Sequence, residues 1–130
     1  MKINSEFKGL KGQLAVQQRA NEKGYIVSIP TMTACRYDLI LERNGKILKA
    51  QCKYVGFQKN DGVARVGLRK HGRNYQRHEI DILLIFLEPI QKIVALYDKH
   101  FHNKKEILLR YKAAQATNGQ QCLNVYNFIW

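Results

Sequence analysis

The dipeptide Asn44-Gly45 separates two runs of strand-forming residues and constrains the fold more than any other feature of the sequence. An Asn-Gly pair in this setting predicts a two-residue hairpin with a type I′ turn, because both residues tolerate a positive φ. The sequence therefore predicts two antiparallel strands, one over residues 36–43 and one over residues 46–55.

This turn also predicts which residues face each other. If Arg43 faces Lys46, counting outward along the ladder places Asp38 opposite Gln51. Cross-strand neighbours have Cβ atoms about 4.5–5.5 Å apart, so these two side chains could share one cation, with Lys53 on the same face. The alternative is an ordinary solvated face on which Asp38 and Lys53 form a surface ion pair.

Strand alternation divides the hairpin into a core face and a polar face. The core face is apolar and suits packing against a helix; it holds Tyr37, Leu39, Leu41, Leu48, Ala50 and Cys52. The polar face holds Arg36, Asp38, Ile40, Glu42, Ile47, Lys49, Gln51 and Lys53.

The rest of the chain predicts one long helix and several strands. Asn4 or Ser5 can cap a helix that Gly24 ends. The apolar run Ile82–Leu87 indicates a strand buried on both faces, and residues 104–112 fit either a helix or a strand. Further strands are expected at residues 25–30, 63–69 and 92–98. This order indicates a single α/β domain over residues 1–130, built around a mixed sheet.

The formal net charge of +12 favours a polyanionic partner. A membrane surface fits less well than nucleic acid, because the basic residues are spread along the chain and form no basic amphipathic helix. No apolar stretch approaches the roughly 20 residues of a membrane-spanning helix. The first residues contain no secretory signal, so we expect a cytoplasmic, intracellular protein.

Basic and amide side chains alternate between residues 59 and 77. This mixture suits phosphate contacts together with bidentate reading of bases. We expect DNA contacts from Lys59, Arg65, Arg69, Lys70, Arg73, Asn74, Gln76 and Arg77. The alternative is a basic surface that only keeps the protein soluble.

Asp38 followed by Gln51-Cys52-Lys53 resembles the motif of the PD-(D/E)XK nucleases, in its variant with glutamine as the second ligand. The stretches at residues 11–30 and 36–54 are also similar to the opening of the group I intron-associated homing endonucleases of that fold. This resemblance implies a restriction-endonuclease-like core, a mixed β-sheet flanked by helices. It also implies a site-specific double-stranded DNA endonuclease.

The resemblance implies a role for each motif residue. Mg²⁺, or Mn²⁺, would be held by the Asp38 carboxylate, the Gln51 amide oxygen and the Cys52 backbone carbonyl, which are the oxygen ligands a hard cation prefers. Lys53 would position the attacking water or help deprotonate it. Lys53 would also offset charge developing on the phosphate.

Gln13 departs from the family pattern. Related nucleases often carry a glutamate there, in a KGxxGE-like stretch of the first helix, and a neutral amide cannot help to retain a second cation. Three explanations are open: a natural variant with altered metal use, a catalytically inactive DNA-binding relative, or a deliberate inactivating Glu→Gln change. Gln13 can also be an ordinary polar helix residue.

A small nuclease that cuts both strands at a long site needs two active sites. We therefore expect a homodimer or homotetramer on pseudo-palindromic DNA. Two other functions remain open: a non-catalytic nucleic-acid-binding relative of the fold, and a Holliday-junction resolvase.

Overall fold

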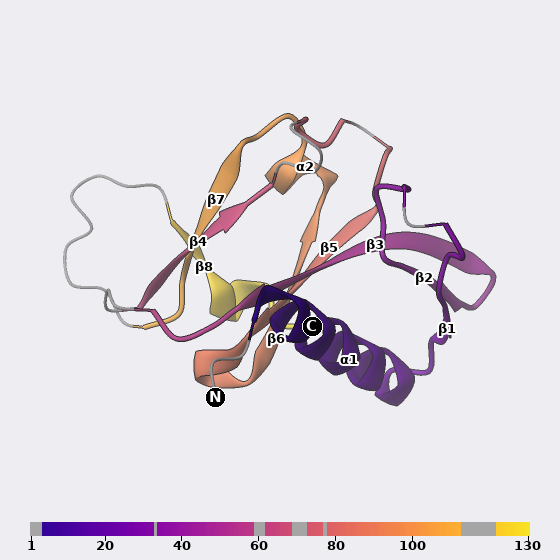
Figure 1. The fold of residues 1–130 in the computed structure, drawn as a ribbon, viewed down its shortest axis with the longest axis horizontal. Helices are drawn as coiled ribbons and strands as arrows, with labels where there is room; N and C mark the ends of the chain where they lie inside the picture. Colours follow the sequence, from indigo (N-terminus) through magenta and orange to yellow (C-terminus); the bar gives the residue numbers. More distant parts are fainter. Residues whose placement is uncertain (1–3, 33, 59–61, 69–72, 77, 113–121) are drawn as a thin grey trace.

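The computed structural model describes residues 4–32, 34–58, 62–68, 73–76, 78–112 and 122–130. Two sheets are formed by these residues (Figure 1). The larger is five-stranded, in the order β1 (Ile26–Ser28), β2 (Leu39–Arg43), β3 (Lys46–Val55), β5 (Ile82–Leu87) and β6 (Lys92–Tyr97). It is mixed, because β3 and β5 run parallel while its other neighbours run antiparallel.

The second sheet is three-stranded and was not foreseen as a separate sheet. Its order is β4 (Val63–Gly67), β7 (Glu106–Arg110) and β8 (Leu123–Asn124). Residues 104–112, which fit a helix or a strand by sequence, therefore contain a strand. The helical segments are α1 (Ser5–Glu22), α2 (Asp98–Phe101), and the 3₁₀ turns η1 (Glu88–Ile90) and η2 (Val125–Asn127).

The hairpin register was predicted correctly from the Arg43–Lys46 pair to the Leu39–Ala50 pair, but the predicted placement of Asp38 directly opposite Gln51 is wrong. Asn44 and Gly45 have φ of 53° and 76°, as a type I′ turn requires, and the ladder pairs Arg43 with Lys46 and ends at Leu39 with Ala50. The first strand is shorter than predicted. The Asp38 N–H donates to the Ala50 carbonyl at 2.8 Å, so Ala50 faces both Asp38 and Leu39, as in a β-bulge.

The bulge makes one face assignment wrong. Tyr37 was expected on the core face with Leu39, but it packs against the cluster on the opposite side of the large sheet. An extra residue at Asp38 interrupts the two-residue alternation, so Tyr37 changes face.

The large sheet separates two apolar clusters. On one face, α1 packs through Val16 and Ala20, while the second sheet covers the other face. β5 supplies both clusters, and its six residues are all buried, which confirms the predicted burial on both faces. Its residues alternate: Ile82, Leu84 and Phe86 pack on the α1 side, and Leu83, Ile85 and Leu87 pack on the second-sheet side.

Helix α1 begins and ends as its sequence predicts. The Asn4 side chain accepts a hydrogen bond from the Phe7 N–H at 3.1 Å, and Gly24 has a φ of 82° just beyond the last turn. Gly12 is the point of closest approach to the sheet: a Cβ there would lie 3.1 Å from Tyr54 Cβ and 3.3 Å from the Lys53 carbonyl oxygen.

Residues after β8 pack against the large sheet. The Trp130 N–H donates to the Ile93 carbonyl, and the Ala95 N–H donates to the Phe128 carbonyl, each at 2.9 Å. Trp130 is buried, whereas Tyr126 is exposed. None of the described helices is long and apolar enough to cross a membrane.

Candidate active site

Strand alternation in β3 places Gln51 and Lys53 on one face of the large sheet. Gln51 pairs with Leu83 and Lys53 with Ile85, and both β5 residues belong to the cluster beneath the second sheet. Cys52 lies on the opposite face, the one covered by α1. The predicted common face for Gln51 and Lys53 is therefore observed.

Asp38 reaches this part of β3 through its side chain. Its Oδ2 accepts a hydrogen bond from the Cys52 N–H at 3.0 Å, so the carboxylate lies beside the peptide that joins Gln51 to Cys52. Burial raises the pKa of the Cys52 thiol, and the negative charge of Asp38 raises it further. Cys52 thus stays a neutral thiol, and the oxygen it offers a ligand is its backbone carbonyl.

Gln51 carries a buried oxygen without a partner among the described residues. The residue is 6% exposed, and its Oε1 accepts no hydrogen bond from the described residues. Its Nε2 lies 3.4 Å from the Cys52 carbonyl oxygen. A buried oxygen left unpaired is costly, which is why such groups in native proteins usually have a ligand or water.

The donor set fits a hard divalent cation. A carboxylate, an amide oxygen and a backbone carbonyl are all oxygen ligands, and Mg²⁺ completes its shell with water and phosphate. The described residues contain no cluster of three or more histidine, cysteine, aspartate or glutamate side chains suited to a metal. A softer metal ion, which prefers nitrogen or sulfur ligands, would therefore find no cluster of such ligands among the described residues.

Among the described residues, Gln13 forms no hydrogen bond with Asp38, Gln51 or Lys53. It lies on α1, which covers the opposite face of the sheet, and its half-buried side chain forms no hydrogen bond to a described residue. The helix turn that carries Gln13 does pack closely on β3, since a Cβ at the neighbouring Gly12 would lie 3.3 Å from the Lys53 carbonyl oxygen.

Comparison with known proteins assigns the family. The family model of the PD-(D/E)XK endonucleases matches residues 3–129. The chain belongs to the PD-(D/E)XK endonuclease family. A solved structure of a bacterial homing endonuclease, I-Ssp6803I, superposes on 98% of this chain and 88% of its own with a TM-score of 0.75.

The two sequences are 21% identical, so this likeness shows the fold alone. It confirms the expected restriction-endonuclease-like fold. No curated protein sequence matches the chain.

This member of the family has a buried cation two residues before Asp38 that sequence reasoning did not single out. Arg36 is 9% exposed, its Nε lies 3.0 Å from Glu79 Oε2, and its guanidinium carbon lies 4.5 Å from the Tyr75 ring centre. Burial raises the pKa of Tyr75 to about 12, with Arg36 opposing and Asp38 and Glu79 adding to the shift. No sequence signal links Arg36 to Glu79, because they join distant segments.

The predicted DNA contacts divide into two groups. Among the described residues, Arg65 lies on β4, is exposed, and pairs with Glu106 at 3.1 Å. Arg73, Asn74 and Gln76 precede β5, where Arg73 and Gln76 are exposed. The other four predicted contacts, Lys59, Arg69, Lys70 and Arg77, lie outside the residues that the structure describes.

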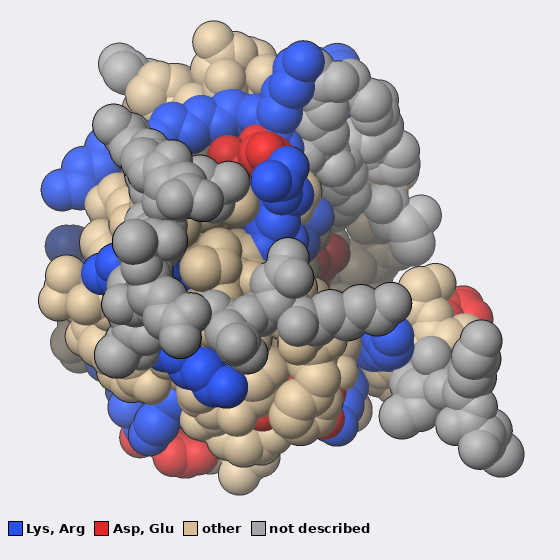
Figure 2. All heavy atoms as spheres, turned by 90° about the vertical axis from the view of Figure 1, so that its left-hand side faces the viewer, with Lys and Arg blue, Asp and Glu red and all other residues tan. Residues whose placement is uncertain are grey.

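The end of the molecule that carries the second sheet is basic. Figure 2 shows Lys and Arg side chains spread over this face, with smaller acidic groups between them. Further basic residues lie on β7 or within two residues of its ends: Lys104, Lys105, Arg110 and Lys112. A polyanion would meet positive potential at this end of the molecule.

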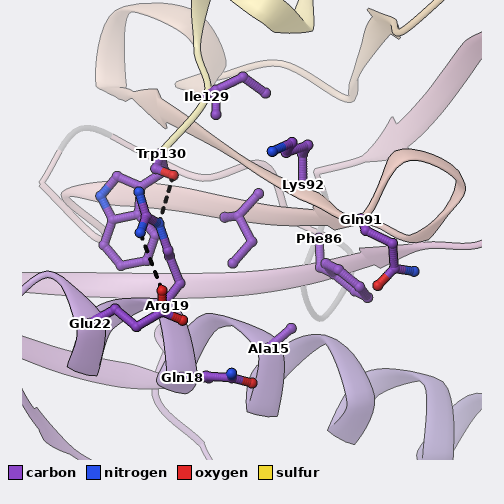
Figure 3. Close-up of a pocket in the computed structure, with 10 residues that line it drawn as sticks. Ala15, Gln18, Arg19, Glu22, Phe86, Gln91, Lys92, Ile129 and Trp130 are labelled. Carbon is purple, nitrogen blue, oxygen red and sulfur yellow. Dashed lines mark hydrogen bonds and ion pairs between the residues drawn. The ribbon is translucent and has the colours of Figure 1, made fainter.

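A cavity of about 440 Å³ lies elsewhere, between α1, β6 and the last residues (Figure 3). One wall holds Arg19, whose Nε donates to the Trp130 carbonyl at 3.0 Å, and Glu22, which lies 3.5 Å from Arg19 Nη1. None of the predicted catalytic residues lines this cavity. It lies on the α1 side of the sheet, apart from Gln51 and Lys53.

Proposed function

We propose that the chain is a site-specific double-stranded DNA endonuclease of the homing type that requires Mg²⁺ or Mn²⁺. The observation that carries the proposal is the buried Gln51 Oε1, which has no partner among the described residues, on a residue whose neighbour Cys52 donates its N–H to the Asp38 carboxylate. The Asp38 carboxylate, the Gln51 Oε1 and the Cys52 carbonyl oxygen would hold the cation, and Lys53 shares the Gln51 face of β3.

Each protein group has a defined task in this proposal. Asp38 supplies negative charge, and its hydrogen bond to the Cys52 N–H keeps its carboxylate against β3. Gln51 supplies a neutral oxygen. The Lys53 ammonium orients the attacking water and neutralises charge that develops on the phosphate. A bound divalent cation would supply Lewis acidity, which lowers the pKa of water and polarises the phosphate.

The DNA substrate is supported by family membership and by charge. The basic end around the second sheet and the loop with Arg73, Asn74 and Gln76 would contact phosphates and bases. Cutting both strands requires two active sites, so the active form would be a homodimer or homotetramer. Sedimentation velocity with and without duplex DNA measures this directly, and a monomer under both conditions would contradict it.

A second candidate is a DNA-binding relative that no longer cuts. The observation that favours it is Gln13, whose neutral side chain stands where the family often has glutamate and forms no hydrogen bond to a described residue.

Plasmid cleavage in Mg²⁺ or Mn²⁺ separates the two candidates. The unchanged chain, Gln13→Glu and Lys53→Ala are compared, with Lys46→Ala at the far end of β3 as the matched lysine control. We expect cleavage to rise with Gln13→Glu, to fall by about 100-fold or more with Lys53→Ala, and to persist with Lys46→Ala. DNA binding without cleavage in every variant would refute the nuclease and support the binding relative.

Sequencing the cut ends from a library of random duplexes tests the homing type. A nuclease of this type should cut at one long, nearly palindromic sequence. Cuts confined to four-way junctions would instead indicate a resolvase.

A further inference from the structure

A buried arginine lies just before the candidate metal ligand. Arg36 is two residues ahead of Asp38, and its guanidinium bridges to a separate segment. Its Nε lies 3.0 Å from Glu79 Oε2, and its Nη2 donates to the Arg73 carbonyl oxygen at 3.1 Å. Arg36 thus joins the chain that enters β2 to the chain that enters β5.

The ring of Tyr75 packs against the Arg36 guanidinium. Its ring is fully buried, lies under Arg36 at 4.5 Å, and packs edge-on against Phe101 at 6.4 Å. The Tyr75 carbonyl accepts a hydrogen bond from the Asn103 N–H at 2.7 Å. Stacking of a planar cation on a fixed ring restrains its orientation as well as its position.

Both carboxylate oxygens of Glu79 contact groups outside the residue itself. Its Oε1 accepts a hydrogen bond from the Gln76 N–H at 2.7 Å, while Oε2 faces Arg36 and lies 3.9 Å from Arg73 Nη2. The Glu79 carboxylate therefore contacts both Arg36 and the loop in which Arg73, Asn74 and Gln76 are the candidate DNA-contacting residues.

Asp38 is anchored on one side by β3. Its N–H bonds to the Ala50 carbonyl, and its carboxylate bonds to the Cys52 N–H. On its other side the chain is not in a strand, because β2 begins only at Leu39. Arg36 supplies a charged, buried anchor at this side, and movement of Arg36 would be transmitted to Asp38 over two residues.

We infer that Arg36, stacked on Tyr75 and paired with Glu79, is a positioning residue that holds the Asp38 carboxylate at the metal site and ties it to the DNA-contacting loop. This inference rests on the proposed function for its metal and DNA, but the position of Asp38 can be measured without either. Such supporting groups around metal ligands change metal affinity by about 10- to 100-fold when removed.

The decisive variant removes both charges together. Arg36→Met alone leaves Glu79 with only the exposed Arg73 as a cation and can lower the melting temperature for reasons unrelated to Asp38. Arg36→Met with Glu79→Gln removes both charges of the buried pair, keeps an acceptor for the Gln76 N–H, and should melt close to the unchanged protein. Arg36→Lys is the second variant, which keeps the charge but loses the planar stack.

Two measurements report on Asp38. The first is hydrogen exchange at the Cys52 amide, which donates to Asp38 Oδ2, with the Phe86 amide of β5 as internal reference. The second is the Mn²⁺ affinity, measured from the electron paramagnetic resonance signal of the unbound Mn²⁺. The matched control is Arg19→Met with Glu22→Gln, a pair on α1 in which Arg19 is half-buried and Glu22 is exposed, on the opposite side of the large sheet from Gln51.

We expect the double variant and Arg36→Lys to exchange the Cys52 amide about 10-fold faster or more, and to bind Mn²⁺ about 10- to 100-fold more weakly. The control should change neither. Unaltered Cys52 exchange in both Arg36 variants would overturn the inference and leave the proposed function standing. Failure of the unchanged protein to bind Mn²⁺ would refute the proposed metal site, while Cys52 exchange would still decide whether Arg36 positions Asp38.

Discussion

A pair of glycines on α1 provides a quantitative test of how the helix meets the strand that carries the candidate site. A Cβ at Gly12 would lie 3.1 Å from Tyr54 Cβ and 3.3 Å from the Lys53 carbonyl, whereas a Cβ at Gly9 would meet nothing within 4 Å. Both positions are helical. The same substitution at each therefore shares the change in helix propensity and differs in the contact with β3.

Glutamine is the useful substitution, because it is a good helix former and too long for the Gly12 contact. Gly9→Gln should stabilise the protein by about 0.5 kcal/mol through helix propensity. Gly12→Gln gains the same term but forces the helix from β3, which costs about 1–3 kcal/mol. The two variants should therefore differ in free energy of unfolding by about 1–3 kcal/mol.

Thermal unfolding makes this difference visible. A chain of 130 residues shifts its melting temperature by about 4 °C per kcal/mol, from an unfolding entropy of about 2.1 cal/mol/K per residue. Gly12→Gln should melt about 4–11 °C below Gly9→Gln, and its cleavage should fall because Lys53 is displaced. Equal melting temperatures for the two variants would show that α1 does not press on β3 at Gly12.

Three further outcomes are expected. Asp38→Asn keeps an acceptor for the Cys52 N–H but removes the negative charge. Its melting temperature should stay within a few degrees of that of the unchanged protein, while its Mn²⁺ affinity should fall at least about 10-fold. An unchanged Mn²⁺ affinity would show that Asp38 is not part of the metal site. Tyr75 has its pKa raised to about 12 from an ordinary 10.0, so the folded state holds this proton more tightly than the unfolded state, and stability is lost as pH rises above 10. Relative to Tyr75→Phe, the unchanged protein should lose about 1.4 kcal/mol between pH 8 and pH 11, measured by urea unfolding, and parallel pH curves would contradict the burial of this hydroxyl. Arg73→Ala should reduce the slope of log affinity against log salt by about 1 for every duplex tested, whereas a loss restricted to one duplex sequence would mean that Arg73 reads a base.

The hairpin could be predicted because its determinants are local. Asn44 and Gly45 accept positive φ, and a two-residue turn allows only one register for the strands that follow. The same holds for β5, whose unbroken apolar run has no polar face to leave in water. The common face of Gln51 and Lys53 followed from strand alternation alone.

Features that depend on distant segments were not predictable in this way. The pairing of β4 with β7 creates a second sheet, and residues 104–112 became a strand because that edge was there to pair with. The bulge at Asp38 moved Tyr37 to the other face, and its cause is the Ala50 carbonyl, which bonds the Asp38 N–H instead of continuing the ladder. Neither is visible in the spacing of residues along the chain.

The sequence by itself determined the turn, the register from Arg43 to Leu39 and the residue types that could form an oxygen-donor site, since these depend on backbone sterics and side-chain chemistry within the hairpin. Only the tertiary structure decided that the Asp38 carboxylate meets the Cys52 amide, that Gln51 keeps a buried oxygen with no partner among the described residues, and that Arg36 is buried against Tyr75 and Glu79. Those contacts join segments that are far apart in the chain. They form because the second sheet and the loop before β5 close over one face of the large sheet and exclude water from it.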